Sequence, residues 1–162
     1  MKFLDLSIKW WETVRKISLE LRPGLLDDLG LVAALEWYSQ DFSKRTRIKT
    51  NFISDITEDK FPQKINIGLF RIFQESLTNI ARHAEAYKTD ISLLWQEQQL
   101  ILLIEDDGKG FDPQIVNDKK TLGFIGMEER ARMIGGTYNV YSTVGKGTII
   151  EVVIPFNIPQ PQ

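Results

Sequence analysis

One face of a predicted long helix carries side chains that could hold a metal ion beside a phosphate group. Glu75 and Asn79 lie four residues apart, and Arg82 and His83 follow three and four residues later. On an α-helix these spacings place the side chains about one turn apart on the same face. Carboxylate and carboxamide oxygens suit Mg²⁺, which usually binds substrate phosphates as well, and Arg or His can meet the phosphate charge. Taken alone, this pattern is more typical of a solvated helix face.

A second group, Asp106-Asp107-Gly108-Lys109-Gly110, directly follows the apolar strand expected over Leu100–Glu105. Glycines two and four residues after Asp106 would let the backbone approach a flat ligand closely. The carboxylate at the strand end could then accept a hydrogen bond from that ligand, as an amino-bearing base requires. By itself, a turn rich in Asp and Gly is more often a plain loop.

Two further segments contain glycines at places where a phosphate or a tight turn would need them. Gly123 and Gly126 lead into a helix expected from about Ile125 to Ile134, and the free N–H groups at a helix N-terminus can bind phosphate. The P-loop pattern GxxxxGK[ST] is missing. Gly145–Thr148 forms a turn that opens the last predicted strand, although an ordinary hairpin loop would look the same. Only the four groups together, in this order, indicate a common site.

The elements that must position these groups can be read from hydrophobic periodicity and from turn residues. Hairpins without regular β-α-β alternation predict an α+β fold. We expect a two-layer sandwich, with a mixed, mostly antiparallel sheet covered by helices on one face. The predicted helices begin near Leu25, Gln63 and Ile125, and the predicted strands cover Ile48–Phe52, Asp90–Trp95, Leu100–Glu105, Tyr138–Ser142 and Thr148–Ile154.

An additional N-terminal helix is expected over Phe3–Leu21, where apolar residues recur at alternating steps of three and four. Its two adjacent tryptophans, Trp10 and Trp11, need to be covered by something. The stripe could pack on the rest of this chain, or it could belong to a dimerising helical hairpin. Pro23-Gly24 would end this helix.

Composition limits the classes of function that the chain could serve. Its 162 residues include 22 acidic and 20 basic side chains, which suits one α/β-containing domain. A net charge of −2 gives no global attraction to nucleic acid or anionic lipid, so we expect neither as a partner. Without cysteine there are no disulfides, thiolate metal sites or cysteine nucleophiles. No apolar run approaches the roughly 18 residues that span a bilayer, so we expect no membrane contact by this chain.

The four groups together resemble the motifs of the Bergerat-type ATPase fold, which gyrase, the Hsp90 chaperones, histidine kinases and the mismatch-repair protein MutL share. The segments that resemble its N box, G1 box, G2 box and closing Gly-Thr element are, in turn, Phe73–Ala84, Asp106–Gly110, Gly123–Gly126 and Gly145–Thr148. Leu21-Arg22-Pro23 and Leu122–Arg130 further resemble sensor histidine kinases of the nitrate-sensor and lipid-thermosensor type.

This resemblance implies ATP and Mg²⁺ as cofactors and gives each candidate residue a role. Asn79 would coordinate Mg²⁺, and Asp106 would bind the adenine amino group. Gly108 and Gly110 would shape the adenine pocket, with Thr148 supporting it.

The same resemblance gives roles to five further residues. Gly123 and Gly126 would let a lid close over the phosphates. Arg82 and His83 would lie near the phosphates or the ribose. Glu75 matches the position that orients or activates a nucleophile in hydrolysing relatives, and whether its role here is catalytic or positional stays open.

The histidine kinases that the chain resembles phosphorylate a histidine on a helix upstream of the Leu21-Arg22-Pro23 region. The only histidine here is His83, inside the segment like the N box. We therefore expect residues 1–22 to be a remnant of the second dimerisation and phosphotransfer helix, 23–156 to be the ATP-binding catalytic domain, and 157–162 to be a disordered tail. The acceptor histidine would lie on a segment absent from this chain.

In the full-length kinase the implied partners are the phosphoacceptor helix, a response regulator and a second copy of the protein. The chain would be the cytoplasmic domain of a membrane-anchored receptor. One alternative is a stand-alone ATPase or an anti-sigma-type serine kinase of the same fold. Another is a non-catalytic module that senses nucleotide or dimerises, although the intact Asn79 and Asp106 argue against a degenerate pocket.

Overall fold

The computed structural model describes residues 23–57, 61–115 and 118–156. The helix expected over Phe3–Leu21 and the tail expected over 157–162 lie outside these residues. The described elements are, in chain order, α2 (Pro23–Thr46), β1 (Lys49–Ser54), α3 (Gln63–Asn79), the π-helix η1 (Ile80–Ala84), β2 (Lys88–Gln96), β3 (Gln99–Asp106), the short 3₁₀-helix η2 (Pro113–Ile115), α4 (Asp118–Met133), β4 (Thr137–Thr143) and β5 (Gly147–Pro155).

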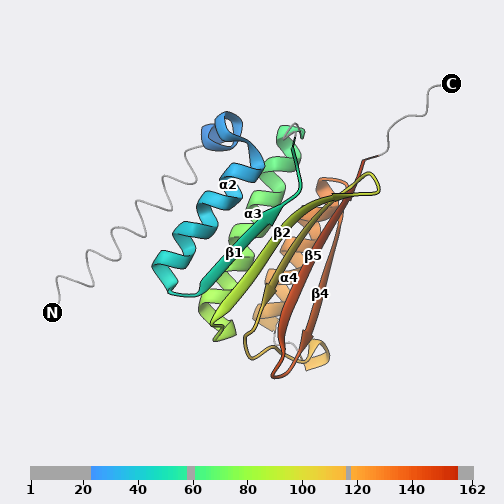
Figure 1. Ribbon diagram of the computed structural model, residues 1–162. Helices are drawn as coiled ribbons and strands as arrows, with labels where there is room; N and C mark the ends of the chain where they lie inside the picture. The colour runs from blue at the N-terminus through green and yellow to red at the C-terminus, as the bar shows by residue number, and fades with distance from the viewer. Residues whose placement is uncertain (1–22, 58–60, 116–117, 157–162) are drawn as a thin grey trace.

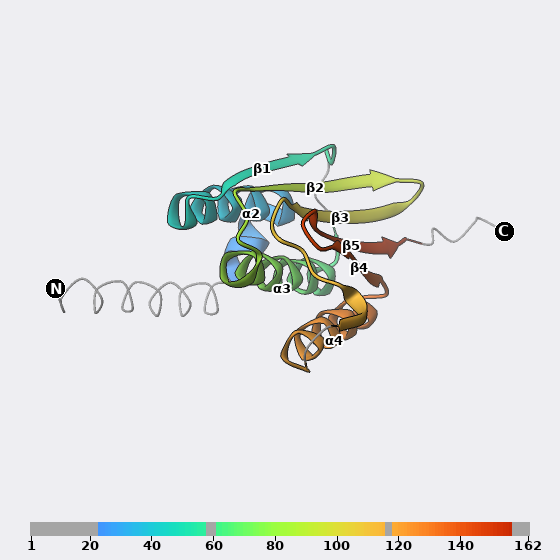
Figure 2. The ribbon, with the colours of Figure 1, turned by 90° about the horizontal axis from the view of Figure 1, so that it is seen from below.

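The strands form one mixed sheet in the order β1-β2-β3-β5-β4. Strand β1 runs parallel to β2, and the other neighbouring strands are antiparallel. Helices α2, α3 and α4 lie together on one face of this sheet (Figure 1). Figure 2 shows the strands as one layer and the helices as a second layer beside it. The α+β, two-layer fold class predicted from the sequence is therefore confirmed.

Alternate residues of the central strands face the helices, because successive side chains of a strand point to opposite faces of the sheet. In β3, Leu100, Leu102 and Ile104 are each at most 1% exposed. The apolar stripe of α3 packs in the same core, where Phe73 and Leu77 are fully buried. This packing fixes the rotation of α3 about its axis and so decides which of its side chains face away from the sheet.

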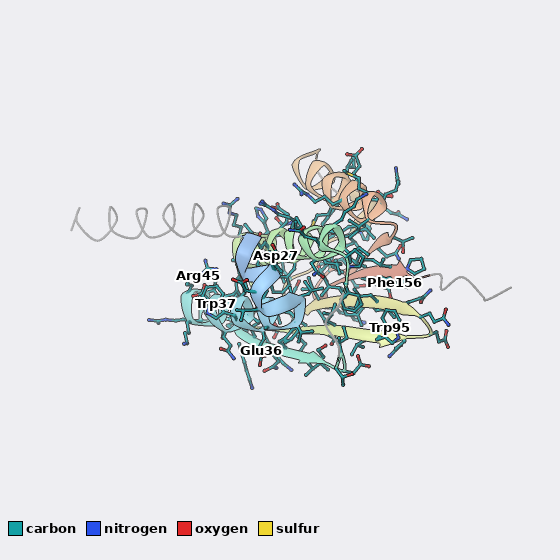
Figure 3. All side chains as sticks on the ribbon, turned by 90° about the horizontal axis from the view of Figure 1, so that it is seen from above. Asp27, Glu36, Trp37, Arg45, Trp95 and Phe156 are labelled. Atoms are coloured by element: carbon teal, nitrogen blue, oxygen red, sulfur yellow. The ribbon has the colours of Figure 1, made fainter. Side chains whose placement is uncertain are left out.

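Helix α2 joins the same core through aromatic contacts. Its backbone leaves helical geometry at Gly30, where φ is 82° and ψ is 172°. Beyond this kink, Tyr38 packs edge-on against Phe70 and Phe73 of α3, with ring centroids 5.8 and 5.4 Å away. The neighbouring Trp37 is 45% exposed on the outer side of α2 (Figure 3).

The two later helices depart from the sequence prediction in different ways. The helix expected from Gln63 begins there and continues to Ala84, but its last turn, η1, is a π-turn with i→i+5 bonds. The expected start of the last helix at Ile125 is wrong, because α4 begins at Asp118. The residues from Asp118 onward support this earlier start, since Asp is a common helix N-terminal residue and Lys119-Lys120 are good helix formers.

Helix α4 ends where its glycines predict. The N–H of Gly136 donates to the carbonyl of Ala131 at 2.8 Å, and that of Gly135 donates to Arg132 at 3.0 Å. Gly135 has a φ of +82°, so it forms the left-handed residue that commonly closes a helix. None of the helices in the described part of the chain combines the length and the apolar character that crossing a bilayer requires.

Candidate functional site

A cavity of about 290 Å³ lies between the C-terminal half of α3, the end of β3 and the first half of α4. Its size is close to the lower end of the range typical of small-molecule sites, roughly 300–1,000 Å³. The residues that line it are Glu75, Ser76, Asn79, Ile80, His83, Ala84, Asp106, Gly110, Phe111, Gly123, Phe124, Thr148 and Ile150. The cavity therefore gathers residues from all four sequence groups.

The α3 wall of the cavity carries Glu75, Asn79 and His83, at steps of four residues. Asn79 is half-buried, whereas Glu75 and His83 are exposed. Arg82 is exposed and does not line the cavity. The π-turn explains why His83 lines the cavity and Arg82 does not, because a turn with i→i+5 bonds holds more residues than an α-turn. The residue four positions after Asn79 then returns to the same face, and the residue three positions after it does not.

Asp106 lines the cavity and is 6% exposed. Its Oδ1 accepts a hydrogen bond from the N–H of Gly108 at 2.8 Å. Burial raises the pKa of Asp106, and hydrogen bonds from the backbone of Gly108 and Thr148 partly oppose this shift. A buried carboxylate of this kind gains most from a ligand that donates a hydrogen bond to it, because solvent does so poorly there.

Gly108 lies beneath the cavity rather than on its surface, since it is buried and does not line it. A Cβ at this position would clash with the backbone carbonyl oxygen of Ala84. The N–H of Lys109 donates to the same carbonyl at 2.8 Å. Glycine at 108 therefore allows the turn after β3 to pack directly against the end of η1.

Thr148 supports the cavity through a small hydroxyl network. Its Oγ1 lies 2.8 Å from Oγ of Ser142, and that Oγ also donates to the carbonyl of Gly147 at 3.1 Å. The N–H of Phe111 donates to the same Oγ at 2.9 Å. The network links the β4–β5 hairpin to the loop that carries Gly110 and Phe111.

The α4 wall differs from the prediction for the segment like the G2 box. Gly123 and Gly126 lie inside the helix, five and eight residues after Asp118, and not in a loop that leads into it. Their N–H groups are thus placed in the i→i−4 ladder instead of at a free helix N-terminus. Gly123 lines the cavity, and the exposed Gly126 does not.

Residues that the sequence analysis did not single out complete the walls. Phe111 and Phe124 stack at 5.5 Å with an interplanar angle of 23°, which joins the loop after β3 to α4. The sequence spacing predicts some of these additional lining residues, because Ser76, Ile80 and Ala84 recur every four residues on the α3–η1 stripe next to Asn79. Nothing in the sequence pairs Phe111 with Phe124, since their contact depends on how α4 packs. The additional lining residues are Ser76, Ile80, Ala84, Phe111, Phe124 and Ile150.

Two curated proteins are similar to most of this chain. The oxygen sensor histidine kinase NreB of Staphylococcus carnosus is 35% identical over 144 residues, which are 89% of this chain and 42% of NreB. The histidine-protein kinase/phosphatase DegS of Brevibacillus brevis is 36% identical over 142 residues, which are 88% of this chain and 36% of DegS. The chain therefore spans less than half the length of these two curated relatives.

Solved structures show the same fold. The histidine kinase domain of the blue-light-activated kinase from Erythrobacter litoralis EL346 superposes with a TM-score of 0.62 at 25% identity, covering 77% of this chain and 60% of that one. The Acinetobacter baumannii histidine kinase AdeS, at 20% identity, has a TM-score of 0.58 over 96% of this chain and 84% of that one, and so supports the fold alone. Residues 65–158 match the family model described as histidine kinase-, DNA gyrase B- and HSP90-like ATPase, and the chain belongs to this family.

Proposed function

We propose that this chain is the ATP-binding catalytic domain of a two-component sensor histidine kinase, and that residues 23–156 form that domain. The observation that carries the proposal is that Asn79 and Asp106, from segments 27 positions apart, line one cavity. The names of NreB and DegS support a histidine kinase over a stand-alone ATPase or a serine kinase. The packing of Tyr38 against α3 supports a domain that begins before residue 65.

The residues that line the cavity suit the nucleoside part of ATP in their polarity. Ile80 and Ile150, which are 4% and 5% exposed, offer apolar surface to a flat base near Asp106. The Asp106 carboxylate would accept a hydrogen bond from the amino group of adenine. The exposed Glu75 and His83 mark the open side, toward which the triphosphate would extend.

Asn79 would bind Mg²⁺ only together with the nucleotide. Among the described residues, no group of three or more His, Cys, Asp or Glu side chains could hold a metal ion. A single carboxamide oxygen is a weak ligand set, so phosphate oxygens and water must supply the remaining positions. When bound, Mg²⁺ would neutralise charge on the phosphates beside Asn79.

The γ-phosphate would pass to a histidine outside this chain. His83 is the only histidine here, and it lies on the wall of the nucleotide site itself. Phosphoryl transfer needs a nucleophile roughly in line with the leaving oxygen, which a side chain fixed on the binding helix cannot readily supply. A phosphoacceptor helix, a second copy of the full-length protein and a response regulator complete the proposal, with the cytoplasmic side of a receptor as its location.

Gly123 and Gly126 would allow the first turns of α4 to rearrange over the phosphates. A Cβ at either position would meet no atom within 4 Å, so packing in the present helix does not require glycine. Each glycine instead costs about 0.8–1 kcal/mol of helix stability relative to alanine. Two such residues next to the cavity fit a segment that leaves helical geometry when nucleotide is present.

Isothermal titration calorimetry with ATP and Mg²⁺ tests the proposal. We expect binding in the millimolar range or tighter, weakened at least tenfold by Asp106→Asn and by Asn79→Ala. Asp112→Ala provides a matched control, because its carboxylate makes a local bond to the N–H of Gln114 and does not line the cavity. The absence of binding heat on protein with a folded circular dichroism spectrum would refute nucleotide binding.

Incubation with γ-³²P-ATP tests the second part of the proposal, that the γ-phosphate passes to a histidine outside this chain. The isolated chain should retain no acid-labile label, and a fragment that supplies the phosphoacceptor helix of the native protein should become labelled in its presence. Label retained on His83 would contradict the proposed location of the acceptor. Steady phosphate release without any acceptor would instead favour a stand-alone ATPase.

A further inference from the structure

Asp107 makes a set of hydrogen bonds that the binding of nucleotide does not require directly. Its Oδ1 accepts from the backbone N–H groups of both Tyr87 and Lys88, each at 2.9 Å. Its own N–H donates to the carbonyl of Lys88 at 3.2 Å. Asp107 does not line the cavity. A carboxylate that accepts two backbone N–H groups makes charge-assisted bonds, which are stronger than those between neutral groups.

These bonds join the two segments that carry the proposed contacts to ATP. Tyr87 and Lys88 stand where the chain leaves η1, passes the left-handed residue Glu85 and enters β2. Asp107 is the first residue after β3 and directly follows Asp106. The bond from Lys109 N–H to the Ala84 carbonyl, at 2.8 Å, provides a second link between the same two segments.

We propose that Asp107 is a positioning residue, which fixes the backbone at the end of β3 so that the Asp106 carboxylate meets the amino group of the base. The inference rests on the proposed function, because it assumes that the Asp106 carboxylate accepts a hydrogen bond from the amino group of adenine. Asp106 is itself held on the strand side by pairing with Thr89 and Thr148. On the loop side, the bonds of Asp107 and the bond from Gly108 N–H to Asp106 Oδ1 restrain it.

A comparison of ATP with purine riboside triphosphate, which has hydrogen in place of the 6-amino group, separates positioning from general stability. A site built to bond an amino group discriminates against a ligand that lacks it. We expect Asp107→Ala to weaken ATP binding about tenfold and to change the affinity for the analogue by less than about threefold. The preference for ATP, measured by calorimetry, should therefore nearly disappear.

Three other variants make the test specific. Asp107→Asn should keep the preference for ATP over the analogue within about twofold of the wild-type value, because its amide oxygen can still accept from both N–H groups. Asp107→Glu keeps the charge but displaces the oxygens by one methylene, so it should lose the preference. Asp55→Ala is the matched control, since the carboxylate of Asp55 accepts from the N–H of Trp95 at 2.9 Å, and Trp95 lies at the end of β2 opposite to Lys88. It should lower the melting temperature and leave the preference unchanged.

Each outcome supports or overturns the inference. A full preference for ATP in Asp107→Ala, or equal losses of affinity for both ligands, would show that Asp107 does not position Asp106. If Asp107→Ala fails to fold, the same two results obtained with Asp107→Glu would overturn the inference. A wild-type protein that binds ATP without any preference would instead contradict the role proposed for Asp106, and one that binds neither ligand would contradict the proposed function.

Discussion

The substitution Gly126→Ala should stabilise the free protein and weaken its binding of ATP. Gly126 lies in the interior of α4 and is exposed, and a Cβ there would meet no atom within 4 Å. Alanine can therefore replace it without strain in the helix. The gain is the difference in helix propensity, about 0.8–1 kcal/mol. For a domain of this size, that corresponds to a rise in melting temperature of about 3–5 °C.

The same free energy sets the expected loss of affinity. If the residues around Gly126 must leave helical geometry when the phosphates bind, alanine stabilises the helix of the free protein. This stabilisation is lost when ATP binds. About 1 kcal/mol then corresponds to an affinity about fivefold lower for Mg-ATP. Gly126→Ser, with an intermediate helix propensity, should show an intermediate gain in stability and an intermediate loss of affinity.

Differential scanning calorimetry of the free protein and titration calorimetry with Mg-ATP measure the two quantities. Glu129→Ala, at an exposed α4 position that does not line the cavity, controls for a general effect of changing the helix surface. It should leave the affinity for ATP unchanged. A Gly126→Ala protein that melts at a higher temperature but binds ATP as tightly as the wild type would refute the reasoning, because Gly126 would then stay helical in the complex.

Asp106→Asn should melt at a higher temperature than the wild type at neutral pH, although it binds ATP less well. Because burial raises the pKa of Asp106, ionisation of this carboxyl destabilises the fold. The wild type should therefore lose stability relative to Asp106→Asn as pH rises above the ordinary pKa of 3.8. Melting temperatures of the two proteins that change in parallel from pH 3 to pH 8 would exclude this effect. Gly147→Ala should lower stability by more than about 2 kcal/mol in urea unfolding, because Gly147 has a φ of +92° and a Cβ there would clash with the carbonyl oxygen of Asp106.

Most of the fold could be predicted because its signals are local. Alternating side chains identify β3, where Leu100, Leu102 and Ile104 face the helices, and a continuous apolar stripe identifies α3. The parallel pairing of β1 with β2 could not be predicted, since alternation in a strand says nothing about its partner. That pairing depends on how α3 covers the sheet between the two strands.

The sequence groups predict several of the residues that line the cavity, but not all of its geometry. Asn79, Asp106 and Thr148 meet at one cavity because each follows a core element whose orientation the apolar pattern fixes. The π-turn that separates His83 from Arg82 has no local signature in the sequence, and its last residue, Ala84, accepts a hydrogen bond from the N–H of Lys109 in the distant turn after β3. The start of α4 was missed because Gly123 and Gly126 are typical of loops, whereas burial of Met127 and Ala131 stabilises the whole helix.

The parallel pairing of β1 with β2 also has a consequence for how the chain folds. Residues paired across β2 and β3 are as few as three positions apart, as at Gln96 and Gln99, so this hairpin can form within microseconds. Residues paired across β1 and β2 are 39 positions apart, as at Asn51 and Asp90, and the entropy of closing that loop must be overcome first. We therefore expect β1 to acquire its protection late in a pulse-labelling hydrogen-exchange experiment and to lose it early on unfolding. The half of the sheet that carries Asp106 and Thr148 would then be assembled before the edge that α2 covers.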